Sequence, residues 1–300
     1  MDGIVYASGR FVAAHEATVS VFDHGVLYGD GVFEGIRAYN RRVFKLDRHI
    51  ERLFQSAAAI RLQMPMTQPE VAALVVDTCR RNAIVDGYIR LVVTRGAGDL
   101  GIDPRSCRRA EVIVIARPVG ALYRRAPNQG ISLATSPFRR LAPDALSPEI
   151  KSLNYLNNVL AKIDAGDRGA DEALFLGADG LVAEATADNI FIATPRGLAT
   201  PPTTQGLKGI TRETVMDIAA EQGVHVEERS ISLVDVWTAR EVFLCGTMAE
   251  VVPVGIVDGR TIGSGEAGEL TKRIMTAYGA LVRASGTPIP AGAEEATEVA

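Results

Sequence analysis

Lys151 is the side chain in this sequence best placed to act as an amine nucleophile. It lies in Glu149-Ile150-Lys151-Ser152-Leu153-Asn154-Tyr155, with apolar residues on both sides of it. Most lysines are solvated surface charges. An amine that apolar neighbours shield from water, however, loses its proton more readily, and the neutral amine attacks aldehydes to form a Schiff base. The segment therefore indicates a candidate Schiff-base lysine.

Two glycine-containing turns have features of anion sites. At Gly209-Ile210-Thr211 a glycine opens an amphipathic helix, and the N–H groups of the first helical turn, together with the Thr211 hydroxyl, suit a phosphate. The turn Cys245-Gly246-Thr247-Met248-Ala249-Glu250 ends an apolar strand and presents further N–H groups beside a hydroxyl. Plain turns share these features, so neither segment identifies a ligand by itself.

Two charged side chains complete the set of candidates. Glu184 stands among apolar and small residues, where a carboxylate is costly unless a positive group pairs with it. A protonated pyridine nitrogen would be such a group. Arg52 falls on the polar side of a predicted helix, and by residue type alone we expect it to be exposed to solvent.

The elements that position these residues begin with an N-terminal α+β region, residues 1–120. Runs of apolar residues predict a hairpin over 4–6 and 11–12. They also predict three further strands, over 18–22, 88–94 and 111–116. Helical spacing predicts two helices, over 46–62 and 68–82. Asp47 is the expected N-cap of the first of them.

Apolar periodicity fades after residue 117, and we expect an interdomain connector over 121–130. A second domain, 131–284, follows. Its predicted strands cover 131–135, 172–176, 189–193 and 241–245. Its predicted helices cover 155–165, 211–222 and 267–284, and Gly223 ends the second of these. The last residues, 285–300, are rich in Ala, Pro and Glu and predict a mobile tail.

The composition disfavours several classes of partner. With 32 basic and 36 acidic residues among 300, the chain has no excess of positive charge for a nucleic acid to bind. The cysteines Cys79, Cys107 and Cys245 are widely spaced, which predicts small buried side chains rather than disulfides or a metal site. No run is long and apolar enough for a bilayer, and the N-terminus has no leader pattern. We therefore expect a cytoplasmic protein without nucleic-acid, membrane or metal partners.

Seven segments in order carry a resemblance to one family. They resemble the motifs of branched-chain aminotransferases, which are fold type IV pyridoxal-phosphate enzymes, and the similarity runs from about Ile4 to Ala284. The segments are Tyr28 to Arg37, His49 to Leu53, Tyr88 to Arg90, Ile150 to Tyr155, Glu184 to Phe191, Gly209 to Arg212 and Gly246-Thr247. The resemblance implies a two-domain fold like that of D-amino-acid aminotransferase, with a smaller N-terminal α+β domain and a larger C-terminal cofactor-binding domain.

The resemblance also implies a role for each candidate. Lys151 would join the cofactor, pyridoxal 5'-phosphate, as a Schiff base and then move the substrate proton as base and acid. Glu184 would pair with the pyridine nitrogen, and Tyr155 would contact the ring hydroxyl. The phosphate would be held by Arg52 and by Ile210, Thr211 and Thr247. The reaction would pass an amino group from a branched-chain L-amino acid to 2-oxoglutarate.

The substrate pocket of the family is matched by a further set of residues: Phe33, Gly35, Tyr88, Arg90, Met248 and Ala249. Arg90 is the candidate for binding a second carboxylate, because a guanidinium binds a carboxylate in a bidentate way. Tyr28 matches a residue that the family supplies across a dimer interface, so a homodimer or larger assembly is implied.

The sequence departs from the family pattern at four positions. Ala185 and Ala187 replace glycines, Lys208 replaces a common proline, and Met248 replaces a typical alanine. We expect each added side chain to lie near the cofactor or the carboxylate pocket and to affect the substrate range.

Three other functions stay open at this point. A D-amino-acid or R-amine aminotransferase would use the same cofactor with the substrate carboxylate in the opposite orientation. Aminodeoxychorismate lyase shares the fold but belongs to another reaction class. A binding protein without cofactor is the third alternative, and it predicts a colourless protein that stays colourless with pyridoxal phosphate.

Overall fold

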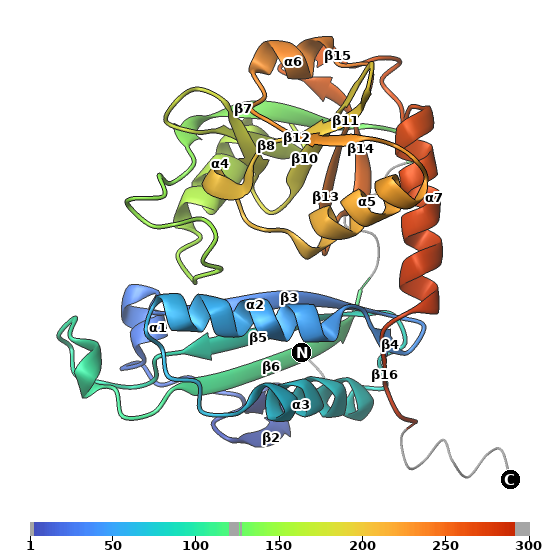
Figure 1. Ribbon diagram of the computed structural model, residues 1–300. Helices are drawn as coiled ribbons and strands as arrows, with labels where there is room; N and C mark the ends of the chain where they lie inside the picture. The colour runs from blue at the N-terminus through green and yellow to red at the C-terminus, as the bar shows by residue number, and fades with distance from the viewer. Residues whose placement is uncertain (1–2, 120–125, 127, 292–300) are drawn as a thin grey trace, which may run out of the picture. The chain divides into compact units, whose positions relative to one another are not determined.

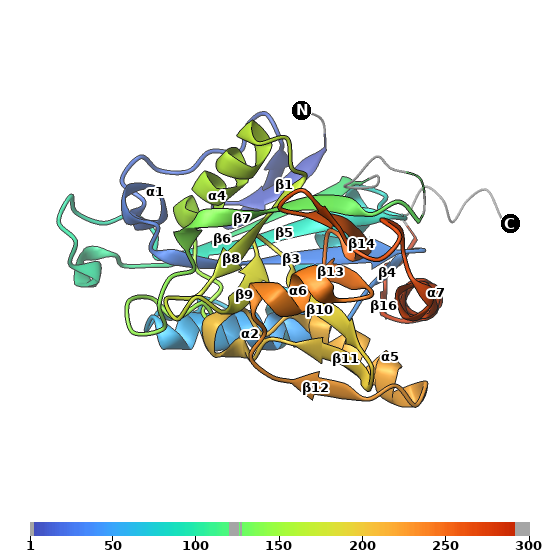
Figure 2. The ribbon, with the colours of Figure 1, turned by 90° about the horizontal axis from the view of Figure 1, so that it is seen from above.

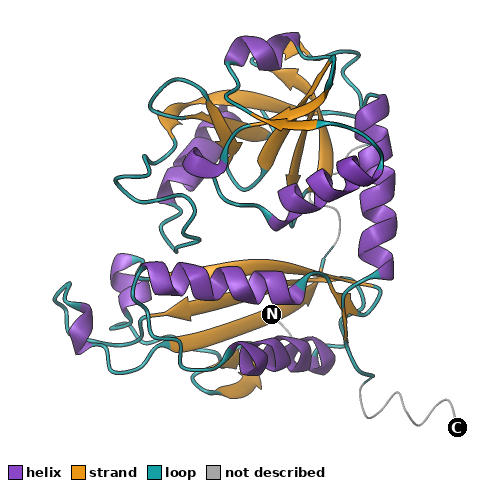
Figure 3. Ribbon diagram, viewed as in Figure 1, coloured by secondary structure: helices purple, strands orange, loops and turns teal. Residues whose placement is uncertain are grey.

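The computed structural model of the protein describes residues 3–119, 126 and 128–291. The chain divides into two compact units, the first made of Met1–Gly120, Ile150–Asn154 and Val282–Ala300, and the second of Ala121–Glu149 and Tyr155–Leu281. Both units combine strands with helices, so the predicted mixed α and β class is confirmed (Figure 3). The expected domain limits differ from this division, because residues 150–154, which include Lys151, belong to the first unit.

A seven-stranded antiparallel sheet forms the base of the first unit. The strand order is β16-β4-β3-β5-β6-β1-β2. The bounds are β1 (Ile4–Ala7), β2 (Arg10–Ala13), β3 (Gly31–Tyr39), β4 (Arg42–Val43), β5 (Gly87–Thr94), β6 (Glu111–Pro118) and β16 (Thr287–Pro288). The predicted hairpin and the predicted strands near 88–94 and 111–116 are confirmed, and those two strands pair with each other.

Two helices of the first unit cover one face of this sheet (Figure 1). They are α2 (Leu46–Ala59) and α3 (Gln68–Arg81), and the short α1 (His24–Tyr28) and a 3-10 turn (Pro104–Ser106) complete the unit. Helix α3 starts at a capping box made by Thr67 and Glu70. Apolar residues of α2 and α3 pack with Ile89, Leu91 and Val93 of β5, which alternate along that strand and so face one core.

Strand β3 is buried along its whole length, and sequence periodicity did not predict it. Val32, Ile36 and Ala38 belong to the core under α2 and α3. Phe33 and Gly35 alternate with them and therefore face the opposite side of the sheet, where they lie across from Val92 and Arg90 of β5. A strand with both faces buried has no polar and apolar alternation to reveal it.

The second unit contains a nine-stranded mixed sheet. Its order is β12-β11-β10-β13-β14-β7-β8-β9, with β15 paired to β14 (Figure 2). The bounds are β7 (Ile131–Arg139), β8 (Glu172–Leu176), β9 (Val182–Ala185), β10 (Asn189–Thr194), β11 (Gly197–Thr200), β12 (Val226–Glu228), β13 (Val242–Gly246), β14 (Glu250–Val257) and β15 (Arg260–Thr261). All four strands predicted for this region are present.

Residues 131–284, the predicted second domain, contain four helices among the described residues. They are α4 (Leu156–Asp167), α5 (Ile210–Glu221), α6 (Leu233–Thr238) and α7 (Glu269–Ala284), and a 3-10 turn covers Thr203–Gln205. The three predicted helices correspond to α4, α5 and α7. Gly223, with φ of +69°, follows the end of α5, as predicted. Within the described residues no helix is both long and apolar enough to cross a membrane.

Several expectations about local structure were wrong. Residues 18–22 form no strand. The N-cap of α2 is Lys45, with φ of 44°, whereas Asp47 lies in the first turn, where a negative charge favours the helix dipole. Residues 285–291, expected in a mobile tail, include β16, which pairs with β4. This segment is held in place because Ile289 is 4% exposed and packs in the hydrophobic core of the first unit. Most of the expected connector and residues 292–300 lie outside the described part of the chain.

Substitution of Ile289 should therefore destabilise the first unit. Ile289→Ala should lower the free energy of unfolding by about 2–5 kcal/mol, because it removes a core side chain and leaves a cavity. Urea denaturation of the wild type and the variant measures this difference. Val85→Ala, at an exposed position of the same unit, is the control and should change it by less than about 0.5 kcal/mol. Equal effects of the two substitutions would show that the C-terminal segment is not part of the core.

Candidate active site

The segment that carries Lys151 runs along an edge of β3. Phe33 N donates to Lys151 O (3.0 Å), and Leu153 N donates to Gly31 O (2.9 Å). Lys151 N also donates to Ser56 Oγ of α2 (3.1 Å). The lysine backbone is thus fixed by a strand and a helix of the first unit, which limits the positions that its amine can take.

The Lys151 amine lies over an aromatic ring. Its Nζ is 4.7 Å from the centroid of the Phe33 ring, and the guanidinium carbon of Arg90 is 4.5 Å from the same centroid. Arg90 also lies 5.4 Å from the Tyr88 ring. The predicted residues Lys151, Phe33, Tyr88 and Arg90 therefore come together on one face of β3 and β5.

The position of the Tyr88 side chain requires a glycine at residue 35. A Cβ atom at residue 35 would lie 2.1 Å from the Tyr88 hydroxyl oxygen and 2.9 Å from Cζ of the same ring. Only a residue without a side chain allows the ring to lie across β3 at this point. The glycine at position 35 thus decides where the Tyr88 hydroxyl is placed.

The opposite face of β3 carries a buried ion pair. Glu34 accepts hydrogen bonds from Arg52 Nε (2.7 Å) and Arg52 Nη2 (2.8 Å). His49 Nδ1 lies 2.8 Å from the same carboxylate. The residue-type expectation that Arg52 is solvent-exposed was wrong, because the side chain is 9% exposed and is held by Glu34.

Burial and charge oppose each other in this cluster. Burial raises the pKa of the Glu34 carboxyl, but Arg52 and the hydrogen bond from His49 outweigh it and hold that pKa at about 2. Burial lowers the pKa of His49, the charges of Arg52 and Lys151 add to this, and together these effects outweigh Glu34, which raises that pKa. At neutral pH Glu34 is therefore ionised, His49 is neutral, and its Nδ1 donates to the carboxylate.

His49, Arg52 and Ser56 share one face of α2. Their spacing of three and four residues places them one above another on a helix. His49 and Arg52 contact Glu34, and Ser56 contacts the backbone of Lys151. Sequence analysis did not select Glu34, His49 or Ser56; on α2 the polar residues His49 and Ser56 share the buried face of the helix with Leu46, Ile50 and Leu53.

Tyr28 occupies the last position of α1 and is 38% exposed. Its hydroxyl donates to Leu100 O in the loop after β5. Nearby, His24 Nε2 lies 2.9 Å from Asp99 O. Asp23 caps α1 by accepting from Gly25 N (2.7 Å). The position of Tyr28 therefore depends on both α1 and the 99–100 loop.

Glu184 is the central charged residue of the predicted site in the second unit. It is 5% exposed and lies on β9. Its Oε1 accepts from Arg140 Nε (2.7 Å), and its Oε2 accepts from Leu207 N (2.9 Å). The positive partner that a buried carboxylate needs is thus Arg140, which sequence analysis did not identify.

The loop that contacts Glu184 leads directly into α5. Asn189 Nδ2 donates to Leu207 O (3.1 Å), so the start of β10 holds this loop. Gly209 is the N-cap, and no side chain caps the first turn of α5, where Ile210 and Thr211 are both buried. The N–H groups of that turn form a candidate phosphate site.

The turn at Thr247, Met248 and Ala249 joins β13 to β14. Because β10 pairs with β13 in the register Asn189↔Cys245, this turn is at the same end of the strands as the loop before α5. The structure thus brings Ile210, Thr211 and Thr247 to one end of β10 and β13, as a shared phosphate site would require.

Tyr155 is the N-cap residue of α4. One turn later, Asn158 is 5% exposed and its Nδ2 donates to Thr186 O (2.6 Å). Thr186 Oγ1 in turn donates to the buried Glu172 (2.6 Å). Helix α4 is therefore anchored to the segment that follows Glu184.

The departures from the family pattern occupy different environments. The side chain of Ala185 belongs to the core of the second unit and not to the Glu184 face, because neighbouring residues of β9 point to opposite sides. Ala187 is exposed, and Lys208 pairs with Glu149 (3.1 Å) on the surface. Met248 is half-buried in the turn after β13.

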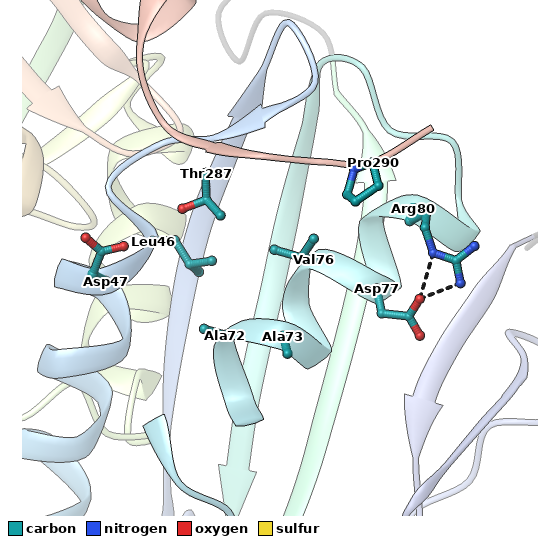
Figure 4. Close-up of a pocket in the computed structure, with 9 residues that line it drawn as sticks. All are labelled: Leu46, Asp47, Ala72, Ala73, Val76, Asp77, Arg80, Thr287 and Pro290. Atoms are coloured by element: carbon teal, nitrogen blue, oxygen red, sulfur yellow. Dashed lines mark hydrogen bonds and ion pairs between the residues drawn. The ribbon is translucent and has the colours of Figure 1, made fainter. Parts of the chain in front are cut away.

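A hollow of about 390 Å³ lies elsewhere in the first unit and is lined by residues from the start of α2, from α3 and from the C-terminal segment (Figure 4). Leu46, Val76 and Pro290 are among the residues that line it, and Asp77 and Arg80 pair with each other (2.6 Å). None of the predicted site residues lines this hollow. Among the described residues, no group of three or more His, Cys, Asp and Glu side chains could hold a metal ion.

The Glu34 ion pair should make the first unit sensitive to acid. Because the folded-state pKa is about 2 and the ordinary value is 4.5, ionised Glu34 contributes about 3 kcal/mol above pH 4.5, and this contribution disappears as the pH falls toward 2. Unfolding free energies of wild type and Glu34→Gln, measured from pH 7 to pH 2, should converge over that window. Glu51→Gln, at an exposed site on α2, is the control. A gap between wild type and Glu34→Gln that does not change with pH would contradict the assignment.

Comparisons with known proteins agree on one family. Residues 31–257 match the model of amino-transferase class IV. The chain is 51% identical to a putative branched-chain-amino-acid aminotransferase of Methanocaldococcus jannaschii, over 91% of this chain and 94% of that protein.

Two solved structures extend this likeness to the fold. A branched-chain amino acid aminotransferase with pyridoxamine 5'-phosphate, from the organism abbreviated T.th., is similar with a TM-score of 0.91 and 36% identity, over 95% of both chains. The branched-chain amino acid aminotransferase of Escherichia coli gives a TM-score of 0.92 and 34% identity, over 95% of this chain and 96% of that one. With the family match covering most of its length, this chain belongs to the class IV aminotransferases.

Proposed function

We propose that this protein transfers amino groups from branched-chain L-amino acids to 2-oxoglutarate and uses pyridoxal 5'-phosphate as its cofactor. The observation that carries the proposal is the Lys151 amine, fixed by its backbone and positioned over the Phe33 ring. Relatives and solved structures named as branched-chain aminotransferases, one of them containing pyridoxamine 5'-phosphate, support it.

The described residues suit this cofactor. The first turn of α5 has no side-chain cap and offers N–H groups of Ile210 and Thr211 to a phosphate, with Thr247 at the same end of the strands. Arg52 is proposed to supply a positive charge to the same phosphate. Glu184 is a buried carboxylate able to keep a pyridine nitrogen protonated, and Tyr155 would contact the ring hydroxyl.

When bound, pyridoxal phosphate supplies an aldehyde that takes up the amino group and a protonated ring that accepts electrons. Lys151 would be the residue that holds the cofactor covalently. When its amine is free, it would take the proton from Cα of the amino acid as a base and later donate that proton as an acid. The backbone bonds of Lys151 to Phe33 and Ser56 restrict the path of this proton.

The substrate assignment rests on Arg90, Phe33 and Tyr88. The guanidinium lies close to the Phe33 and Tyr88 rings, so a positive group that suits the second carboxylate of 2-oxoglutarate or glutamate stands beside apolar surfaces that suit aliphatic side chains. Gly35 keeps Tyr88 in this arrangement, and Met248 and Ala249 are proposed to border the same substrate. A D-amino-acid or R-amine aminotransferase is the alternative for the same cofactor.

We also propose a homodimer, located in the cytoplasm, to which Tyr28 contributes across the interface. Helix α4 exposes Leu156, Val159, Leu160 and Ile163, a stripe at helical spacing, with Leu156 70% exposed. Sedimentation equilibrium should give the mass of two chains. Replacement of Leu156 and Ile163 by Glu should give the mass of one chain, because charges would enter an apolar interface. A wild type that sediments as one chain would exclude the dimer.

The amino donor can be identified from the first half of the reaction. Protein loaded with pyridoxal phosphate should convert the bound cofactor to its amine form with L-leucine, and should react far more slowly with D-alanine and R-phenylethylamine. Absorbance spectra record this conversion directly. Reaction with only the D or R donors would show that the protein is a D-amino-acid or R-amine aminotransferase instead. Failure of 2-oxoglutarate and pyruvate to reverse the conversion would favour the lyase.

Lys151→Ala is the control for this experiment. It should bind the cofactor without joining it covalently, and conversion with L-leucine should fall by at least about a thousandfold, because both the covalent link and the proton carrier are lost. Borohydride reduction followed by peptide mapping should place the pyridoxyl label on Lys151 in the wild type. A label on another lysine would overturn the assignment.

A further inference from the structure

We infer that Glu34 and His49 are positioning residues that orient the Arg52 guanidinium for phosphate binding. This inference rests on the proposed function, because it takes Arg52 to be a phosphate ligand. Neither residue is expected to touch the cofactor. Both would act through Arg52, and they would determine how well the protein distinguishes a phosphorylated ligand from the same ligand without its phosphate.

The geometry of the Glu34 and Arg52 pair fixes the guanidinium in two ways. The carboxylate accepts from both Nε and Nη2, at 2.7 and 2.8 Å, and such a bidentate contact sets the plane and the rotation of the guanidinium. Glu34 is itself rigid, since it is fully buried on β3, which is paired along its length with β5. An arginine on a helix alone would have many rotamers available.

His49 completes this support from one turn earlier on α2. Its Nδ1 donates to Glu34 Oε2 at 2.8 Å, the oxygen that also accepts from Arg52 Nη2. The carboxylate is therefore held from two directions and cannot rotate without losing a hydrogen bond. Because His49 is buried and neutral at pH 7, it fixes Glu34 without adding a second positive charge to the cluster.

A purely structural ion pair is the rival explanation. The same contacts tie α2 to β3, and their loss could simply loosen the first unit. In that case a variant would lose stability, and its affinity for every ligand would fall by a similar factor. The positioning role predicts something else, namely a loss that depends on the phosphate group.

The test compares two ligands on the apoprotein. Dissociation constants for pyridoxal 5'-phosphate and for pyridoxal are measured by absorbance titration with wild type, Glu34→Gln and His49→Ala. Glu34→Gln should weaken pyridoxal phosphate binding by about tenfold or more while the constant for pyridoxal changes less than about twofold. His49→Ala should have the same selective effect, and His49→Gln, whose amide can still donate to Glu34, should restore much of the affinity.

Glu51→Gln is the matched control, because Glu51 lies on the same helix, is exposed, and contacts Arg48 and Gln55 of that helix rather than Arg52 in the described contacts. It should leave both constants unchanged. Thermal melts of each apoprotein separate loss of fold from loss of affinity, and His49→Ala keeps the test valid if Glu34→Gln does not fold. Equal weakening of both ligands, or no weakening of either, would overturn the inference. A wild type that does not prefer pyridoxal phosphate to pyridoxal would instead refute the proposed function.

Discussion

One constraint governs the first unit: β3 is buried on both faces, and its alternate residues must serve different purposes. Val32, Ile36 and Ala38 fill the core under α2 and α3, while Phe33 lies on the other face beside the Lys151 amine. Because successive side chains of a strand point to opposite sides, a shift of one residue in the β3–β5 register would exchange these roles. The long antiparallel register with β5 excludes such a shift.

Each unit also contains a carboxylate that is buried with an arginine. Glu34 pairs with Arg52, and Glu184 pairs with Arg140. Replacement of a whole buried pair of this kind by well-packed apolar residues is often neutral or stabilising, but the loss of one partner leaves a costly buried charge. Their value in an enzyme is that they hold a charged group in one orientation before the ligand arrives, which reduces the ordering that binding requires.

In the second unit the backbone provides most of the positioning. Glu184 accepts a hydrogen bond from Leu207 N, Leu207 lies three residues before the first turn of α5, and Asn189 holds the same loop at the start of β10. The groups proposed for the two ends of the cofactor are therefore linked by one hydrogen bond and the short loop that leads into α5. Sites built on strands and helix ends hold their geometry better than sites on long loops.

The sequence alone determined the mixed α and β class, the helices over 46–62, 68–82 and 155–165, and the candidates Lys151 and Glu184, because periodicity and local composition are properties of neighbouring residues. It could not reveal β3, whose two buried faces lack alternation, nor the pairing of Glu184 with Arg140, which is 44 residues away. Tertiary structure also decided that residues 150–154 join β3 and that Ile289 completes the first core. Hydrogen bonds and packing between distant segments leave no local pattern, so only the folded chain shows which residues they bring together.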